Sequence, residues 1–477
     1  MKVLHAGTSG FRGVVNTEIT PEHALRIGKI YTSIVAEGIS CPPRMAIGHD
    51  NRAGAQMLAQ AASAGALSMG AQVLVVGNIT TGFFSHILTL QKCDGAIFIT
   101  GSHMPANRIG IIPLNADGTY CTPEVTDLIT TSFARKIAPE GVQFLNLQTA
   151  SQITVRDLTN PYLSFLFEAL PTRLAQIQKN LEQLTEGVNL KVLVDCVNGP
   201  ASLVAKEALE IMGCKVTLLH REMKPVPDRP SQCTAENCTK ASQIVREQGF
   251  ALGVCFDTDA DRSLFIDENG NVLDDDVVGA IFAKATLQAG DACVTPVNAG
   301  PLITEICESL GASVHHCRIG QPSTGKAIKE VDAVFAYEAA AGKFCWPRQM
   351  MWYDGVYAAM RMVEIMATRQ MKLSELVAEF PKFYRDDLKV ELPEDIDREA
   401  LAVKTFGFAR ERYADNITAE FTMDGLRLNL TDGAVLIMRL SGTEPLARVS
   451  GISKDEGRAF KVATVGQSIW QRAATEI

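Results

Sequence analysis

Short apolar segments alternate with longer amphipathic segments along this chain of 477 residues. Apolar runs bounded by turn residues predict buried strands. They lie at Val73–Val76, Ala96–Ile99, Val192–Val194, Gly253–Phe256, Val334–Tyr337 and Val435–Met438. Segments with helical periodicity lie at Gly54–Met69, Tyr162–Leu184, Ser202–Met212, Val278–Leu287, Ile303–Leu310 and Gly355–Thr368. Strands that alternate with helices indicate an α/β protein with largely parallel sheets.

One local pattern occurs three times along the chain. A helix ends at Met-Gly or Leu-Gly and an apolar strand follows, at Ala66–Val73, Ala208–Val216 and Ile306–Val314. Glycine just beyond a helix adopts the left-handed conformation that closes its carbonyl end. A single joint of this kind is ordinary in α/β proteins, but three copies predict three related α/β units.

The order of the segments predicts four domains, and the length alone suggests three or four at roughly 150 residues each. We expect three α/β units at residues 1–157, 158–272 and 273–380. Residues 381–477 lack the repeat and predict a separate C-terminal α+β domain.

The composition is that of an ordinary globular protein, with 47% hydrophobic and 21% charged residues. The net charge of −9 argues against nucleic acid or an anionic membrane as a main partner, although clustered arginines can still bind an anionic substrate. No apolar run approaches the ~20 residues of a membrane span, and the first ten residues lack a signal-peptide pattern. The twelve cysteines form no CxxC pair, which predicts reduced thiols and a cytoplasmic protein.

The most informative chemical motif is Asp257-Thr258-Asp259-Ala260-Asp261-Arg262, between the apolar runs Gly253–Phe256 and Ser263–Ile266. Three carboxylates at alternate positions of a turn can converge on one hard cation, and a merely solvated turn would leave them to repel one another. An EF-hand is excluded because Arg262 stands where that loop needs glycine and because strands flank the turn. The motif therefore predicts a metal site, with Mg²⁺ favoured.

Three further loops follow predicted strands. Thr100–Pro105 places Ser102 beside His103, which fits either an activated nucleophile or an ordinary capped turn. Arg439–Pro445, with Arg448 close behind, supplies the guanidinium, hydroxyl and glycine groups of a phosphate cradle, or again of a capped turn. In the third loop Glu338 ends a strand, and its carboxylate can accept hydrogen bonds from sugar hydroxyls.

A metal loop, a serine and a phosphate cradle together indicate phosphoryl transfer. The sequence contains neither a Walker A motif nor the protein-kinase signatures, so a nucleoside triphosphate need not be the donor.

In this order along the chain, the motifs resemble those of the α-D-phosphohexomutases, a family that includes phosphoglucomutase, phosphomannomutase and phosphoglucosamine mutase. Gly7–Gly13 is similar to the family's N-terminal signature, Thr100–Pro105 to its phosphoserine loop, Asp257–Arg262 to its metal loop, Glu338–Gly342 to its sugar-recognition loop and Arg439–Pro445 to its phosphate-binding loop. The pair Asp354-Gly355 also resembles a family feature. The resemblance covers nearly the whole chain.

The resemblance implies four domains around a central cleft and a Mg²⁺-dependent phosphosugar mutase. Such an enzyme interconverts 1-phospho and 6-phospho (or 5-phospho) sugars through a phosphoserine and a bisphosphorylated intermediate, with a sugar bisphosphate as activator. Ser102 is implied as the phosphoserine and, with Asp257, Asp259 and Asp261, as a Mg²⁺ ligand. Arg12 and Arg262 are implied to steady the reacting groups. The implied substrate-binding residues are Glu338, Lys343, Arg439, Ser441, Gly442, Thr443 and Arg448.

Two departures from the family pattern bear on function. Ile112 stands where the family has a lysine thought to transfer protons, and a hydrocarbon cannot do so. His103, Lys343 and Lys326 are candidates for the missing group. In the sugar loop Ala340 replaces a polar residue and Lys343 replaces a histidine, so the sugar is not predicted, and a pentose phosphate or an amino sugar phosphate remains open.

These departures leave two alternatives to the mutase. One is a non-catalytic paralogue that binds sugar phosphates or a protein partner, and the other is a phosphatase-like variant that transfers phosphate to water. The intact Ser102, aspartate loop and Arg439 loop favour the mutase, since a decaying site would not keep its metal ligands. No feature of the sequence predicts an oligomeric state.

Overall fold

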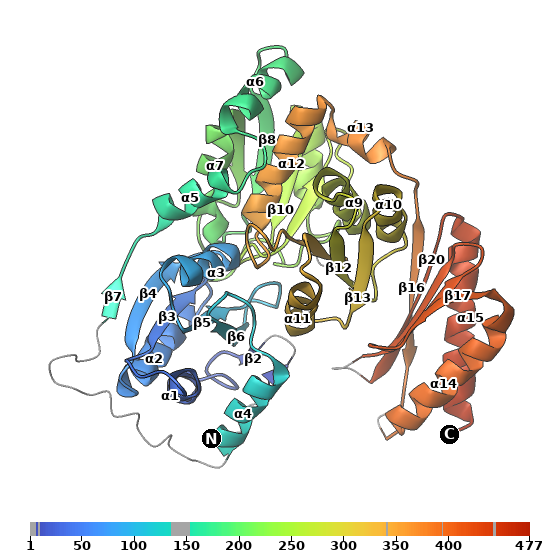
Figure 1. Cartoon of the computed structure of the whole chain (residues 1–477), viewed down its shortest axis with the longest axis horizontal. Helices are drawn as coiled ribbons and strands as arrows, with labels where there is room; N and C mark the ends of the chain where they lie inside the picture. The colour runs from blue at the N-terminus through green and yellow to red at the C-terminus, as the bar shows by residue number, and fades with distance from the viewer. Residues whose placement is uncertain (1–5, 8–9, 135–152, 340–341, 394, 442–444) are drawn as a thin grey trace.

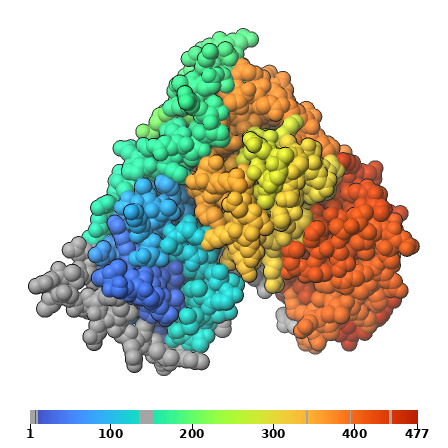
Figure 2. Space-filling view, in the orientation of Figure 1, coloured from blue at the N-terminus to red at the C-terminus, as the bar shows by residue number. Residues whose placement is uncertain are grey.

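The computed structural model of the chain describes residues 6–7, 10–134, 153–339, 342–393, 395–441 and 445–477. Three α/β units are followed by an antiparallel C-terminal domain (Figure 1). The space-filling view in Figure 2 is hollowed between the first unit and the C-terminal domain. The predicted fold class, four domains around a central cleft, is confirmed.

The first unit contains a seven-stranded sheet in the order β1-β2-β6-β5-β3-β4-β7. Its strands are β1 (Ala6–Gly7), β2 (Gly10–Val14), β3 (Arg44–His49), β4 (Gln72–Asn78), β5 (Gly95–Thr100), β6 (Arg108–Asn115) and β7 (Ile153–Val155). Its helices are α1 (Pro21–Ala36), α2 (Ala55–Ser68), α3 (Thr81–Leu90) and α4 (Pro123–Ala134).

The second and third units each contain a four-stranded sheet. The second has β8 (Leu190–Asp195), β9 (Cys214–Leu219), β10 (Leu252–Phe256) and β11 (Ser263–Ile266), with α5 (Thr159–Glu168), α6 (Leu174–Leu184), the 3₁₀ turn η1 (Pro200–Leu203), α7 (Ala205–Ile211) and α8 (Thr239–Gln248). The third has β12 (Ala292–Pro296), β13 (Ser313–Cys317), β14 (Phe335–Glu338) and β15 (Lys343–Cys345), with α9 (Asp275–Thr286), α10 (Leu302–Leu310), α11 (Gln321–Val331), α12 (Gly355–Arg369) and α13 (Leu373–Ala378).

The strand orders show that the three units are copies of one design. The order β6-β5-β3-β4 of the first sheet recurs as β11-β10-β8-β9 in the second and as β15-β14-β12-β13 in the third. In each, the first pair is antiparallel and the remaining pairs are parallel. The glycines of the repeated joint, Gly70, Gly213 and Gly311, have φ of 83°, 104° and 69°. The predicted repeat is therefore confirmed, with the left-handed glycine that the pattern requires.

The hydrophobic core joins the three units and leaves the C-terminal domain apart. On β5, Ala96 and Phe98 face a core shared with the second and third units. Ile97 and Ile99 alternate with them and pack in a separate core on the other face of the first sheet. The C-terminal domain packs its own core around Trp470.

Two predicted helices were wrong in extent. Tyr162–Leu184 forms two helices, because α5 ends at Glu168 and α6 begins at Leu174. Pro171 lies between them, and proline lacks the backbone N–H that a continuous helix would need. The predicted helix Ser202–Met212 similarly begins as the 3₁₀ turn η1 before α7.

The C-terminal domain is antiparallel throughout, with the strand order β16-β20-β19-β18-β17. It contains β16 (Tyr384–Glu391), β17 (Ile417–Phe421), β18 (Leu426–Leu430), β19 (Val435–Leu440), β20 (Leu446–Ser453), α14 (Arg398–Tyr413), the 3₁₀ turn η2 (Ala414–Asn416) and α15 (Glu456–Thr475). Polar contacts attach it to the third unit. Buried Arg427 donates to the carbonyl of Val297 at 3.0 Å, and Arg385 donates to that of Asn298 at 2.9 Å.

Helix α12 follows the third sheet in the chain but also packs against α6 and α7 of the second unit. The predicted domain boundaries at 157, 272 and 380 stay predictions. None of the helices described here is both long and apolar enough to cross a membrane. All twelve cysteines are free thiols, and all but Cys41 and Cys233 are buried.

Candidate active site

The predicted chemical motifs occupy the same loop in each of the three units. The β5–β6 loop carries Ser102, the β10–β11 loop carries the three aspartates, and Glu338 and Lys343 flank the β14–β15 loop. Each loop follows the carboxyl end of the strand that corresponds to β5, which is where ligands bind in α/β sheets. The repeat therefore brings three different chemistries to one place.

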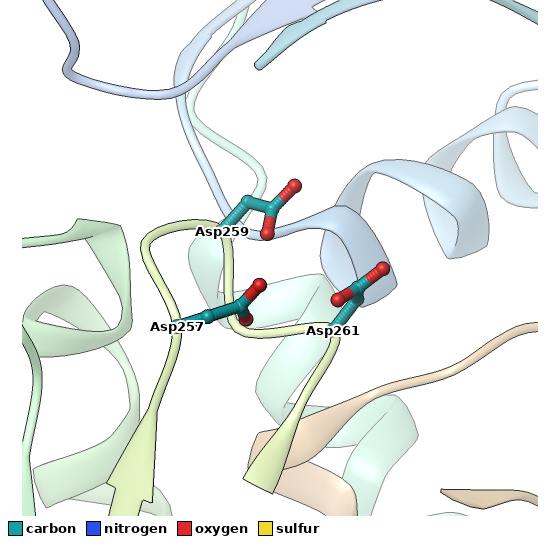
Figure 3. A group of neighbouring side chains, drawn as sticks. All are labelled: Asp257, Asp259 and Asp261. Carbon is teal, nitrogen blue, oxygen red and sulfur yellow. The ribbon is translucent and has the colours of Figure 1, made fainter. Parts of the chain in front are cut away.

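The side chains of Asp257, Asp259 and Asp261 converge in the loop between β10 and β11 (Figure 3). One carboxylate oxygen from each lies within 4.8 Å of the others, and all three residues are buried. Ala260 turns the chain between the last two aspartates with a left-handed φ of 52°. The predicted convergence of these carboxylates is thus present in the fold.

The charge of the aspartate cluster is only partly compensated by protein groups. Burial, together with repulsion from the other aspartates, raises the pKa of Asp257 well above its usual range and that of Asp259 to about 6. Burial acts in the same direction on Asp261, but Lys343 and Arg262 outweigh it and lower the pKa of Asp261. Within the part of the chain that the structure describes, Oδ1 of Asp259 and Oδ1 of Asp261 are buried without a hydrogen-bond partner. A hard divalent cation fits this donor set, because it binds carboxylate oxygens and neutralises their repulsion.

Ser102 lies directly against the aspartate cluster. Its buried Oγ donates to Oδ2 of Asp257 at 2.7 Å and lies 3.2 Å from Nδ1 of His103. The backbone at Ser102 has a left-handed φ of 44°, a conformation that surrounding contacts must stabilise in a residue with a side chain. One such contact is the bond from the Ser102 amide to Oγ1 of Thr100, at 2.9 Å.

Cationic and neutral groups cover the other side of the cluster. Nζ of Lys343 donates to Asp261 at 2.6 Å, and Nε of Arg262 lies 3.7 Å from Asp257. Burial, with the charges of Arg262 and Arg12, lowers the pKa of His103 to about 2, so its imidazole is neutral. The predicted residues of the first three units thus surround one point.

The sugar-loop residue Glu338 is buried beside two hydroxyl groups. Its Oε1 accepts from the hydroxyl of Tyr353 at 3.0 Å and from that of Thr324 at 3.4 Å. Ala340, at which the sequence departs from the family pattern, lies outside the described residues.

Two positions that bear on proton transfer lie outside these loops: Ile112, where the family has a lysine, and Lys326, a candidate to replace it. Ile112 is 1% exposed and packs in the shared core. The side chain of Lys326 is 72% exposed, and its ammonium pairs with Glu330 at 3.7 Å. Of the three candidates, only His103 and Lys343 contact Ser102 or the aspartates in the described structure.

The phosphate-binding motif lies in the C-terminal domain. Arg439 on β19 stands directly opposite Arg448 on β20, a register that brings two like charges together. Nη2 of Arg439 donates to Asp424 at 2.9 Å, and the same carboxylate accepts from the amide of Ile319 in the third unit at 3.2 Å. The amide of Ser441 donates to the carbonyl of Leu446, while Gly442 and Thr443 lie outside the described residues.

Several site residues were missed in the sequence. Oδ2 of Asp50 accepts from the amide of Gly101 at 2.9 Å, and Arg52, two residues further on, contacts the Ser102 loop. Thr81 donates to Asp259 at 2.9 Å, and Gln321 donates to Asp261 at 3.1 Å. All four follow the ends of parallel strands, so a search of every strand end, and not only of clustered motifs, would have found them.

This arrangement is suited to moving a phosphoryl group. A buried hydroxyl lies beside three converging carboxylates that could hold a cation, and arginine and lysine charges stand around it. Phosphoryl transfer depends mainly on such positioning and charge neutralisation. Fold and site together therefore define a four-domain phosphotransferase.

The chain belongs to the phosphoglucomutase/phosphomannomutase family. It matches the family's alpha/beta/alpha domain I over residues 4–140, domain II over 168–270 and domain III over 274–384. A phosphoglucomutase/phosphomannomutase of Thermococcus kodakarensis is 30% identical over 471 residues, which cover 98% of each chain. A phosphopentomutase of the same organism is also 30% identical, over 474 residues and 98% of each chain.

Solved structures share the fold at lower identity. A phosphoglucomutase/phosphomannomutase family protein of Burkholderia thailandensis has a TM-score of 0.82 and 19% identity, with coverage of 98% of this chain and 97% of that one. An N-acetylphosphoglucosamine mutase of Aspergillus fumigatus, in complex with GlcNAc-6P and magnesium, has a TM-score of 0.59 and 15% identity, with coverage of 99% and 96%. The predicted resemblance is confirmed. The protein is a phosphosugar mutase, which is an intramolecular phosphotransferase, and this function is favoured over the non-catalytic and phosphatase-like alternatives.

Proposed function

We propose that the protein moves a phosphoryl group between the 1-position and the 6-position (or 5-position) of a sugar through phosphorylated Ser102. The observation that carries this proposal is the bond of 2.7 Å from Oγ of Ser102 to Asp257, inside the buried aspartate cluster. No other serine of the described residues bonds to that cluster. An oxygen at this place can exchange a phosphoryl group next to a bound cation.

The exchange consists of two transfers that balance. In the first, the bond between phosphorus and Oγ of phosphorylated Ser102 breaks, the free hydroxyl of the sugar phosphate takes the phosphoryl group and loses its proton, and Ser102 takes up a proton. The sugar bisphosphate then turns over, and its other phosphate returns to Ser102 by the reverse exchange. Neutral His103, 3.2 Å from Oγ, and Lys343 are the groups placed to move these protons.

We assign the cation site to Asp257, Asp259 and Asp261, with phosphorylated Ser102 as a further ligand. Mg²⁺ is the cation proposed, because three carboxylates match its preference for oxygen ligands, and two of their buried oxygens accept no hydrogen bond within the described residues. When bound, Mg²⁺ neutralises charge on the phosphoryl oxygens. Arg12 and Arg262 provide further positive charge, which is felt at His103 beside Ser102.

The far phosphate of the substrate is assigned to the C-terminal domain. Arg439 and Arg448 face each other across two strands, and Asp424 supplies one negative charge beside them. An anion between two arginines relieves their repulsion and accepts charge-assisted hydrogen bonds. Ser441, Gly442 and Thr443 complete this site by the family resemblance, and Glu338 with Lys343 faces the sugar between the two phosphates.

The sugar is proposed as a hexose, hexosamine or pentose phosphate. Relatives named for glucose and mannose and for pentose are equally similar to this chain, at 30% identity each. A sugar bisphosphate is proposed as the activator that first phosphorylates Ser102. Twelve free cysteines support a reducing compartment such as the cytoplasm.

The test is to incubate the purified protein with Mg²⁺, a trace of sugar bisphosphate and a panel of 1-phospho sugars, and to follow products by ³¹P NMR. Conversion to the 6- or 5-phosphate is expected for at least one sugar. The Ser102→Ala variant should lose at least about 10⁴-fold in rate, since removal of a nucleophile abolishes the covalent route, and mass spectrometry should find phosphate on the wild-type Ser102 peptide. Free phosphate as the main product, or normal isomerisation by Ser102→Ala, would contradict the proposal.

A further inference from the structure

Arg52 is buried at the centre of the site, at 3% exposure, although it belongs to none of the motifs assigned above. It follows β3 in the first unit, and its guanidinium is directed at the protein itself. Nη1 donates to the carbonyls of Pro105 and Arg108 at 3.0 and 3.2 Å, and Nη2 donates to the carbonyl of Ser102. One side chain therefore holds the Ser102 loop at three of its carbonyl groups.

The same guanidinium reaches the second unit. Nη2 lies 2.8 Å from Oγ of Ser231 and 3.1 Å from Oγ1 of Thr258, and these two hydroxyls are bonded to each other at 2.9 Å. Thr258 stands between the first two aspartates of the metal loop. Arg52 thus connects the loop that carries Ser102 to the loop that carries the cation ligands, across the boundary of two units.

Two local features fit this connection. Ser102 has the left-handed φ of 44°, and the bond from Arg52 to its carbonyl stabilises that backbone. At Gly101, a side-chain carbon would collide with the guanidinium of Arg52. The glycine before Ser102 is therefore required by the position of the arginine.

We propose that Arg52 is a positioning residue for phosphoryl transfer, which sets Oγ of Ser102 against the aspartate cluster while making no contact with the substrate. The inference rests on the proposed role of Ser102. Displacement of reacting groups by about 1 Å costs on the order of 10²-fold in rate, so the effect of Arg52 is on turnover and not on the affinity for the sugar phosphate.

The test compares Arg52→Ala and Arg52→Lys with the wild type in steady-state kinetics. Both variants should lose about 10²-fold in kcat with KM within about threefold, because lysine cannot make the divergent bonds of a guanidinium. Added methylguanidine should restore part of kcat to Arg52→Ala and none to Arg52→Lys, whose side chain fills the space. Arg410→Ala is the control, because its side chain pairs with Glu420 at 2.7 Å in the C-terminal domain and belongs to no part of the Ser102 loop, and it should retain wild-type kinetics.

A second variant, Thr258→Val, tests the same connection without removing the buried charge of Arg52. Thr258→Val keeps the shape of the side chain but removes the hydroxyl that Arg52 contacts, and it should lower kcat about tenfold at unchanged KM. Normal kcat in Thr258→Val and Arg52→Lys, or a raised KM at normal kcat, overturns the inference. Should Arg52→Ala fail to fold, Thr258→Val and Arg52→Lys decide. A Ser102→Ala variant that stays active would instead overturn the proposed function, so the two failures are distinguishable.

Discussion

The aspartate cluster and the arginine pair are both assigned to phosphate groups, yet they are built in opposite ways. Asp257, Asp259 and Asp261 are at most 2% exposed and are bonded by groups from the first and third units. The side chain of Arg439 is 23% exposed and forms an ion pair with the carboxylate of Asp424, which is 24% exposed. Protein contacts hold the aspartates in place, whereas Arg439 is more open to solvent and is held by one ion pair. We therefore expect geometry to govern the reacting phosphate and charge to govern the far one.

Among the changes that test this comparison, the largest effect is expected at the aspartate cluster itself. Asp259→Asn keeps the shape of the side chain and removes one charge of the cation site, so Mg²⁺ affinity and kcat/KM should both fall, the latter on the order of 10³-fold. Calorimetric titration with Mg²⁺ and the reaction rate measure the two effects. Asp228→Asn, at an exposed aspartate that pairs with Lys224, is the control. Equal Mg²⁺ affinity in the wild type and Asp259→Asn would contradict the assignment of the Mg²⁺ site to these aspartates.

The next effect separates two candidates for proton transfer. Lys343→Ala removes the ammonium that lies 2.6 Å from Asp261, and the rate should fall about 10²-fold, as is usual for loss of an acid–base group. Lys326→Ala should behave as the wild type, because its side chain is 72% exposed and pairs with Glu330. If both variants keep the wild-type rate, His103 becomes the remaining candidate.

A smaller effect is expected at the far phosphate. Arg439→Ala should raise KM about tenfold with little change in kcat, since one charge-assisted contact to the substrate is lost. Because the site is partly exposed, salt should raise the wild-type KM more than that of the variant. Arg410→Ala, which breaks an exposed pair with Glu420 in the same domain, is the matched control. A kcat effect without a KM effect would place Arg439 at the reacting end instead.

The smallest effect concerns stability at the junction of the three units. Asp354 is fully buried, accepts from the hydroxyl of Tyr162 and from the amide of Tyr357, and its pKa is raised to about 6 by burial. In the unfolded chain it titrates near 3.9. Folding therefore favours the protonated form of Asp354. The contribution of this protonation to the free energy of unfolding is fully present below about pH 4 and is lost as the pH rises through about 6.

The measurement is the free energy of unfolding of wild type and Asp354→Asn across this pH range. Relative to the variant, the wild type should lose up to about 3 kcal/mol between pH 4 and pH 6. A difference between the two proteins that stays constant with pH would show that Asp354 titrates normally.

The parts of the site that could be predicted are those whose contacting residues lie close together in the sequence. The aspartate loop and Ser102 were found because their chemistry is gathered within six residues that follow an apolar strand. Arg52 was missed because its partners Ser231 and Thr258 lie 179 and 206 residues further along the chain. The bond from Lys343 to Asp261 was likewise not predicted, since only the packing of two units brings them together.

The fold followed a similar rule. The three repeated joints predicted three related α/β units, because each joint records a local constraint on a helix end, whereas the strand order that the units share was found only in the structure. The helix expected at Tyr162–Leu184 failed where Pro171 interrupts an amphipathic pattern that otherwise continues. The long-range arrangement, such as α12 against the second unit, had no local signal.

The division of the site among repeated units has a consequence for the order in which a nascent chain acquires activity. Ser102 leaves the ribosome 155 residues before Asp257, and Asp261 leaves 82 residues before Lys343. While the 155 residues from Ser102 to Asp257 are added, the chain holds the serine without the aspartates, and while the 82 residues from Asp261 to Lys343 are added, it holds the aspartates without the lysine. On the proposed assignment the site is complete only after the C-terminal domain has been made, because Arg439 and Arg448 lie there, so we expect truncated chains to be inactive.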